Sequence, residues 1–279
     1  MRIIFFGTPD FAMPVLESLI KTGYNVSHFK SKPLKDERIF EEFKNLSPDL
    51  CVVAAYGKIL PSRYLKVPKY GFLNVHPSLL PKYRGPSPIQ TAILNGDKET
   101  GVSIMVVDEE MDHGPIITKH ETQIMNHEYN EALSKRLFTL GAELLIETLP
   151  KYINEEIRPE PQGHSQATFT KMFSRDDGRI DWGDSPEKIY NQIRALNPEP
   201  GTWTTWNGKI INIKKAELID PVRSRARTLS ASPEDRGAAT SNGVDGKLNI
   251  QVIQMEGKKE MPFKEFLNGY PDFDISQLK

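Results

Sequence analysis

Residues 72–88 read FLNVHPSLLPKYRGPSP, where a short apolar run passes directly into a loop that contains four prolines. Proline lacks the backbone N–H that strand pairing needs, and it breaks the interior of a helix. The run FLNV therefore predicts a buried strand that ends near His76. The prolines predict a rigid loop beyond it, because they restrict the conformations of the unfolded chain.

Strand-like and helix-like patterns alternate on both sides of this stretch. The predicted strands are RIIFFG, YNVSHF, DLCVVAAY, GVSIMVVD and PIITKHETQI. The predicted helices are DFAMPVLESLIKTG, DERIFEEFKNL, SPIQTAILNG and residues 130–156, the last with leucines on one face. Apolar strands that alternate with helices are typical of a parallel sheet covered on both faces. We therefore expect an α/β domain with a mostly parallel sheet.

The pattern changes after about residue 156. The polar, proline-bearing residues 157–171 predict a linker. Beyond it, SPEKIYNQIRALN predicts a short helix with Asp184 or Ser185 as its N-cap. The segment TWTTWNGKIINIKKAELI predicts two strands joined by an Asn-Gly turn, and KLNIQVIQMEGKKEM adds another strand. We predict two domains, residues 1–170 and residues 171–279, the second of which is small and β-rich.

The composition is that of a soluble globular protein. Of the 279 residues, 38% are hydrophobic, and no apolar run reaches the length of a membrane-spanning helix. The single cysteine, Cys51, excludes an intramolecular disulfide framework and favours a cytoplasmic location. Cys51 lies in a strand-like run, where a small core residue is expected. The net charge of −1 gives no general sign of nucleic-acid binding. The basic cluster RSRAR, from Arg223 to Arg227, fits a solvated loop as well as an RNA contact.

Polar side chains of three kinds lie at predicted strand ends. Asn74 and His76 are two residues apart in FLNVHP, so their side chains point to the same side. Asp112 lies in the turn DEEMDHG at the end of another strand. Ligands of open α/β sheets bind beyond the carboxyl ends of the strands. An amide that donates to an oxyanion, a histidine that moves a proton and a carboxylate that orients the histidine suit acyl transfer.

The spacing of these residues also allows simpler interpretations. A histidine near a strand end is often a hydrogen-bonded structural residue, and Asp112 alone fits a turn position. His113, His120 and His127 recur every seven residues, but they fall in a turn, a strand and a loop. Because these positions do not converge as metal ligands must, we predict no metal site.

Several blocks of the sequence resemble one enzyme family. NVHPSLLPKYRGPSPIQ and GVSIMVVDEEMDHGPII resemble the signature of the folate-dependent formyltransferases. IIFFGTPDFA, DGRIDWGDSPEKIYNQIRALNPEPGTWT and QMEGKKEMPFKEFLNGY resemble segments of the methionyl-tRNA formyltransferases in particular. The blocks follow the family's order over nearly the whole chain. This resemblance implies a Rossmann-like catalytic domain and a barrel-like (OB-like) C-terminal domain that binds tRNA.

The resemblance also implies a reaction and its residues. The formyl group of 10-formyltetrahydrofolate would pass to the amino group of methionine on initiator tRNA, in a monomeric cytoplasmic enzyme without a metal. By position, Asn74 would hold the formyl oxygen, His76 would assist proton transfer, and Asp112 would pair with His76. The folate-contacting residues would be Ser78, Leu79, Leu80 and Pro81. Arg84 fits an anion contact and a solvated surface position equally well.

Other functions fit parts of the same pattern. Formyltransferases that act on amino sugars or on glycinamide ribonucleotide are similar in the HPSLLP block and the aspartate, but the C-terminal blocks favour the tRNA enzyme. A hydrolase that releases the formyl group to water could use the same side chains. A non-catalytic RNA-binding relic is the alternative from a different class, and the presence of Asn74, His76 and Asp112 argues against it.

The chain departs from the family pattern after its second strand. Only residues 30–48 separate YNVSHF from DLCVVAAY, which leaves room for one crossover helix and no further strand. Methionyl-tRNA formyltransferases usually carry a longer, basic loop here that is implicated in gripping the tRNA. We therefore expect the sheet to have one strand fewer than in those enzymes. The sequence leaves unanswered how the chain would contact tRNA without that loop. The basic residues that remain are Lys30, Lys32, Lys35 and Arg38.

Overall fold

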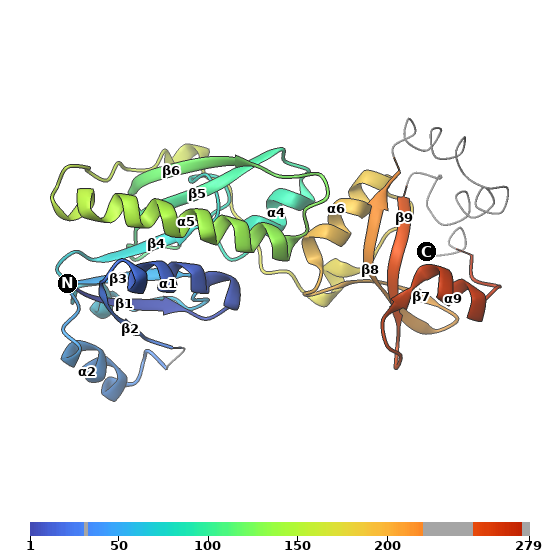
Figure 1. The fold of residues 1–279 in the computed structure, drawn as a ribbon, viewed down its shortest axis with the longest axis horizontal. Helices are drawn as coiled ribbons and strands as arrows, with labels where there is room; N and C mark the ends of the chain where they lie inside the picture. Colours follow the sequence, from blue (N-terminus) through green and yellow to red (C-terminus); the bar gives the residue numbers. More distant parts are fainter. Residues whose placement is uncertain (31–32, 220–247, 275–279) are drawn as a thin grey trace. The chain divides into compact units, whose positions relative to one another are not determined.

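The computed structural model describes residues 1–30, 33–219 and 248–274. The chain forms two compact units (Figure 1). The first unit comprises Met1–Ala92, Asp97–Met125 and Glu131–Met172, and the second comprises Ile93–Gly96, Asn126–Asn130 and Phe173–Lys279. None of the helices in the described residues combines the length and the hydrophobicity that a membrane span requires.

The first unit is built on a six-stranded sheet in the order β2-β1-β3-β4-β5-β6. Its strands are β1 (Arg2–Gly7), β2 (Asn25–His28), β3 (Leu50–Ala54), β4 (Phe72–His76), β5 (Glu99–Val106) and β6 (Ile116–Gln123). Strands β1 to β4 pair in parallel, whereas β5 pairs antiparallel with β4 and β6. The prediction of an α/β unit with a mostly parallel sheet is confirmed.

Helices connect these strands. They are η1 (Asp10–Ala12), α1 (Met13–Lys21), α2 (Glu37–Asn45), α3 (Ser62–Leu65), α4 (Pro88–Leu94), α5 (Asn130–Ile153) and the short turn η2 (His164–Gln166). Helix α2 is the only regular element between β2 and β3 among the described residues, as the length of that segment predicts. Asp36 caps α2 by accepting from the backbone N–H of Arg38, and its carboxylate also pairs with the Arg38 guanidinium at 3.0 Å. Lys32 lies outside the described residues.

One face of the sheet packs on α2 through an aromatic cluster. Phe6 of β1 is completely buried, as the apolar run RIIFFG predicts. Its ring centroid lies 5.2 Å from that of Phe29, 6.0 Å from Phe43, 5.1 Å from Tyr56 and 5.5 Å from Phe72. Because Phe43 comes from α2 and Phe72 from β4, this cluster joins elements that are distant in sequence.

Helix α5 packs very closely on the sheet. A Cβ atom at Gly141 would lie 2.5 Å from Cγ1 of Val75 and 3.0 Å from Cγ1 of Val102, so only glycine allows this approach. The apolar face predicted for this helix is partly correct. Leu133, Leu137 and Leu145 are buried, whereas Leu140 and Leu144 are half-buried.

The second unit contains an antiparallel sheet in the order β10-β9-β8-β7. Its elements are η3 (Arg175–Gly178), α6 (Pro186–Leu196), β7 (Thr202–Trp206), β8 (Lys209–Leu218), β9 (Leu248–Met255), β10 (Met261–Pro262) and α9 (Phe263–Gly269). The predicted Asn-Gly turn joins β7 to β8, with φ of 49° at Asn207 and 73° at Gly208. Ser185 caps α6 by accepting from the backbone N–H of Lys188 at 3.2 Å.

A second hydrophobic core fills this unit. Ile189 and Ile193 of α6 pack with Ile211 and Ile213 of β8 and with Phe266 of α9. The pairing among the described strands is open, so closure into a barrel stays a prediction. The cluster from Arg223 to Arg227 lies outside the described residues.

Candidate active site

Asn74 and His76 lie at the carboxyl end of β4, in the interior of the sheet. Asn74 is opposite Val53 of β3 and Met105 of β5, and His76 is opposite Ser103 of β5. Asn74 is half-buried, and His76 is only 4% exposed. Strand β4 therefore ends directly before the proline-rich loop, as the sequence predicts, and β5 flanks both residues.

Asp112 reaches both of these side chains from the turn between β5 and β6. Its Oδ1 accepts from Asn74 Nδ2 at 3.2 Å and lies 3.5 Å from Nδ1 of His76. Its Oδ2 accepts from the backbone N–H of Gly85 at 2.8 Å. The structure thus brings together the three residues whose convergence the sequence predicts.

The surroundings of His76 select one tautomer of the neutral ring. Its Nε2 lies 3.0 Å from the carbonyl oxygen of Tyr83, and a carbonyl can only accept. Oδ1 of Asp112 on the other side of the ring is also an acceptor, but at 3.5 Å it is farther from Nδ1 than the Tyr83 oxygen is from Nε2. The shorter contact favours the proton of the neutral imidazole on Nε2, with Nδ1 as the basic nitrogen. A proton taken up at Nδ1 would lie beside the carboxylate of Asp112, which would stabilise its charge.

The predicted folate-contacting residues differ in what they expose. The side chains of Ser78 and Leu80 are buried, at 1% and 0% exposure, so they cannot present a side-chain surface to a ligand. Leu79 and Pro81 are half-buried and keep exposed surface. Of the predicted set, only Leu79 and Pro81 are therefore available to line a wall with their side chains.

Ser103 of β5 holds this loop in place. Its Oγ accepts from the backbone N–H of Leu80 at 3.1 Å and donates to the carbonyl oxygen of Ser78 at 2.7 Å. Lys119 of β6 donates from Nζ to the carbonyl oxygen of Leu80 at 2.9 Å. The loop is thus anchored by the neighbouring strands as well as by its prolines.

Residues 160–170, which we call the strap, were predicted to be part of a linker, and this prediction is wrong. The backbone N–H groups of Glu160 and Ile116 each donate to the other residue's carbonyl at 2.8 Å. The backbone N–H of Arg84 donates to the carbonyl oxygen of Thr168, and the backbone carbonyl of Arg84 accepts from the N–H of Thr170, both at 2.8 Å. The strap therefore pairs with β6 and with the proline-rich loop, and it belongs to the first unit.

The sequence allowed Arg84 to be an anion contact or a solvated surface residue, and in the structure it is neither. Its side chain is 4% exposed. It donates to Oε1 of Gln162 from Nε at 3.1 Å and from Nη2 at 2.8 Å, and Nη2 also lies 2.8 Å from Nδ1 of His164. Gln162 in turn donates from Nε2 to the carbonyl of Asp112 at 2.9 Å and to that of Gly114 at 2.7 Å. Sequence reasoning missed Gln162, since a glutamine in a polar segment carries no local signal.

The remaining candidate side chains have other partners. Nδ1 of His113 lies 2.7 Å from Oδ2 of Asp108, and its ring stacks on that of His164 with centroids 4.2 Å apart. In the part of the chain that the structure describes, no group of three or more His, Cys, Asp or Glu side chains is placed to hold a metal ion. Cys51 is a buried core residue, and its burial raises the pKa of the thiol well above the usual value.

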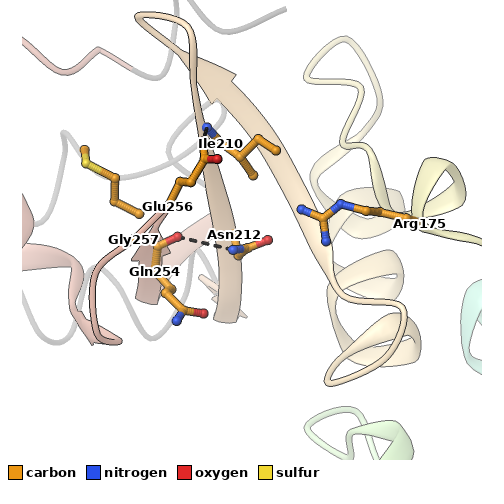
Figure 2. Close-up of a pocket in the computed structure, with 7 residues that line it drawn as sticks. Arg175, Ile210, Asn212, Gln254, Glu256 and Gly257 are labelled. Atoms are coloured by element: carbon orange, nitrogen blue, oxygen red, sulfur yellow. Dashed lines mark hydrogen bonds between the residues drawn. The ribbon is translucent and has the colours of Figure 1, made fainter.

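A cleft of about 240 Å³ lies in the second unit and contains none of the residues predicted from the sequence. Figure 2 shows Arg175 pointing toward Asn212 of β8, whose Nδ2 lies 3.5 Å from the carbonyl oxygen of Gln254. Beside the cleft, the guanidinium carbons of Arg175 and Arg179 lie 5.7 and 5.9 Å from the ring centroid of Trp203. The residues that line the cleft include Arg175, Ile210, Asn212, Gln254, Glu256 and Gly257.

Comparisons with known proteins agree over almost the whole chain. The formyl transferase family model matches residues 17–149, and the formyl transferase C-terminal domain model matches residues 172–271. The methionyl-tRNA formyltransferase of Halalkalibacterium halodurans is 37% identical over 300 residues, which cover 96% of this chain and 95% of that protein. The methionyl-tRNA formyltransferase of Dictyoglomus turgidum is 38% identical over 306 residues, 97% of this chain and 96% of that protein.

Solved structures show the same fold at lower identity. HypX from Aquifex aeolicus, in complex with tetrahydrofolic acid, matches 98% of this chain and 48% of that chain with a TM-score of 0.75 and 18% identity. A methionyl-tRNA formyltransferase from Clostridium thermocellum matches 79% of this chain and 95% of that chain with a TM-score of 0.65 and 21% identity.

Proposed function

Because the chain belongs to the formyl transferase family and to its methionyl-tRNA formyltransferases, we propose that it transfers the formyl group of 10-formyltetrahydrofolate to the amino group of methionyl initiator tRNA. The observation that carries the proposal is the contact of Asp112 with both Asn74 and His76 at the carboxyl end of β4. These side chains supply an amide donor, a base and a carboxylate within hydrogen-bonding reach of one another. We propose Asn74, His76 and Asp112 as the catalytic residues.

Asn74 stabilises the charge that develops on the formyl oxygen. The methionyl nitrogen forms a bond to the formyl carbon, and the carbonyl π electrons move to oxygen, which gives a tetrahedral oxyanion. One N–H of the Asn74 amide donates to Asp112, and the amide has a second N–H to offer. Since Asp112 fixes the amide group, this donor is oriented before the reaction begins.

His76 and Asp112 handle the protons of the reaction. Nδ1 of His76 takes the proton that the attacking nitrogen loses, and the Asp112 carboxylate stabilises the resulting imidazolium. As the oxyanion collapses, the bond between the formyl carbon and N10 of the donor breaks. N10 receives the proton that the His76 imidazolium gives up, which returns the histidine to its neutral form. The products are formylmethionyl-tRNA and tetrahydrofolate. The side chains of Leu79 and Pro81 form the wall against which the donor lies, and the buried Ser78 and Leu80 support this wall from behind.

The initiator tRNA is the macromolecular partner in this proposal, and the second unit contributes to its binding. Arg175 and Arg179 bring positive charge to the face of Trp203, and the neighbouring cleft offers the amides of Asn212 and Gln254. Arginine contacts phosphates, and an indole face can stack on a base. We place the enzyme in the cytoplasm with its tRNA, and we propose a monomer, as the family resemblance of the sequence implies.

Replacing Arg175 with alanine should weaken tRNA binding by about threefold to tenfold and lower the slope of log affinity against log salt by about one. The KM for the folate donor should not change. Filter binding at several salt concentrations measures the first two effects. Arg158, an exposed arginine of the first unit, gives the matched control Arg158→Ala. Equal tRNA affinities for the wild type and both variants would remove this contact from the proposal.

Formylation of methionyl initiator tRNA by the purified wild type tests the function itself. With 10-formyltetrahydrofolate as donor, we expect formylmethionine to accumulate. An amino-sugar nucleotide, glycinamide ribonucleotide and water should compete poorly as acceptors in parallel reactions. If the formyl group passes to one of the small amines and not to tRNA, that amine is the true acceptor. Rapid release of free formate would indicate a hydrolase. Failure to bind the folate donor would contradict any enzymatic function.

A further inference from the structure

Gln162 is the one buried side chain among residues 154–172. The flanking positions of the strap are exposed or half-buried, whereas Gln162 is 5% exposed. Burial of a polar side chain costs free energy unless its hydrogen bonds are satisfied. Such a residue in an otherwise exposed segment therefore points to a specific role for its amide group.

The amide of Gln162 is fully engaged. Its oxygen accepts two hydrogen bonds from the guanidinium of Arg84, and both hydrogens of its nitrogen point to carbonyl oxygens, those of Asp112 and Gly114. We propose that Gln162 is a positioning residue for formyl transfer, which holds the turn that carries Asp112. This inference rests on the proposed function, because it concerns the same catalytic carboxylate.

We call these hydrogen bonds of Gln162 the clamp, and the turn needs it because Asp112 has a strained backbone conformation and apolar packing beside it is small. Asp112 has φ of +51°, in the left-handed region that residues with a Cβ seldom adopt. Its neighbour Met111 is 54% exposed, so apolar burial contributes little there. The two bonds from Gln162 Nε2 fall on either side of His113 and fix the path of the turn. The carboxylate of Asp112 can then reach Asn74 and His76.

Arg84 makes this clamp stronger than an ordinary amide contact. A hydrogen bond to a charged donor is about twice as strong as a neutral one, and it polarises the amide that accepts it. The Gln162 nitrogen therefore donates more strongly to the Asp112 and Gly114 carbonyls. Arg84 is itself fixed by the backbone pairing with Thr168 and Thr170, so the strap links the proline-rich loop to the Asp112 turn.

Replacing Gln162 with glutamate keeps the contact with Arg84 and removes the hydrogen bonds to Asp112 and Gly114. The carboxylate keeps the shape of the side chain and its acceptor oxygen for Arg84, but it has no hydrogen to give and repels the Asp112 and Gly114 carbonyls. We expect kcat to fall by about tenfold to a hundredfold, as positioning effects do. The KM values for the folate donor and tRNA should stay within about threefold of wild type. Gln166→Glu, the same chemical change at an exposed strap position, should leave kcat unchanged.

A second substitution, Gln162→Asn, keeps the amide but shortens the side chain by one methylene, so it cannot reach both partners. It should lower kcat in the same way, and it decides the question if Gln162→Glu does not fold. Circular dichroism melting curves show whether each variant is folded. Full kcat in a folded Gln162 variant, or a loss that appears only as a raised KM, would overturn the proposal. If the wild type itself formylates no amine, the proposed function fails instead, so the two failures are distinguishable.

Discussion

Replacing Asn74 with alanine should lower kcat for formyl transfer by about two to three orders of magnitude, the usual loss when one oriented oxyanion donor is removed. Asn74 lies on an interior strand, its amide is fixed by Asp112 at 3.2 Å, and no other side-chain amide donates to this carboxylate among the described contacts. Alanine leaves the strand intact, so binding of the folate donor should persist. Initial rates with saturating donor and tRNA measure the change.

Two further variants distinguish the loss of a donor from damage to the site. His76→Ala should also lower kcat strongly, because it removes the basic nitrogen beside Asp112. His120→Ala is its matched control, since His120 is an exposed histidine of β6. We expect the control to retain wild-type activity. An Asn74→Ala enzyme with a wild-type kcat would show that the formyl oxygen is held elsewhere.

Replacing Phe6 with alanine should lower the free energy of unfolding by about 3–5 kcal/mol, the range for phenylalanine truncation in a core. Phe6 is fully buried and meets four other aromatic rings from different segments of the first unit. The truncation removes these contacts and leaves a cavity that the surrounding strands can fill only in part. A loss of this size is a large fraction of the stability of a typical domain.

Urea denaturation followed by fluorescence and circular dichroism measures this effect. The matched control is Phe169→Ala, because the Phe169 side chain is 72% exposed, and its removal should change the free energy of unfolding by less than about 0.5 kcal/mol. Similar destabilisation by both variants would contradict the aromatic cluster as the main support of this face of the sheet. Because the chain has two compact units, each unfolding transition in the urea curve is assigned to one of them before the two variants are compared.

Much of the fold was predictable because it depends on local patterns. The strand RIIFFG, the helix that Ser185 caps and the Asn-Gly turn at Asn207 all occur where the sequence predicts them. The positions of Asn74 and His76 at a strand end follow from the same reasoning, because proline ends the strand. Side-chain alternation in β4 then places both groups on one side.

The residues of the proposed folate wall were less predictable. Leu79 and Leu80 are adjacent and chemically identical, yet Leu80 is completely buried and Leu79 keeps exposed surface. Which of two such residues turns inward depends on the loop's path, which Ser103 fixes from a neighbouring strand. A motif marks the segment that forms such a wall, but it does not say which atoms face the ligand.

Local sequence patterns specify most strands and helices of this protein, the Asn-Gly turn and the strand end that carries Asn74 and His76, because periodicity and proline act over a few residues. Long-range contacts alone establish that the strap pairs with the proline-rich loop and that Gln162 joins Arg84 to Asp112. Gln162 is 78 residues from Arg84 and 50 from Asp112 along the chain. Contacts at that separation arise from how the whole first unit closes, and no local pattern records them.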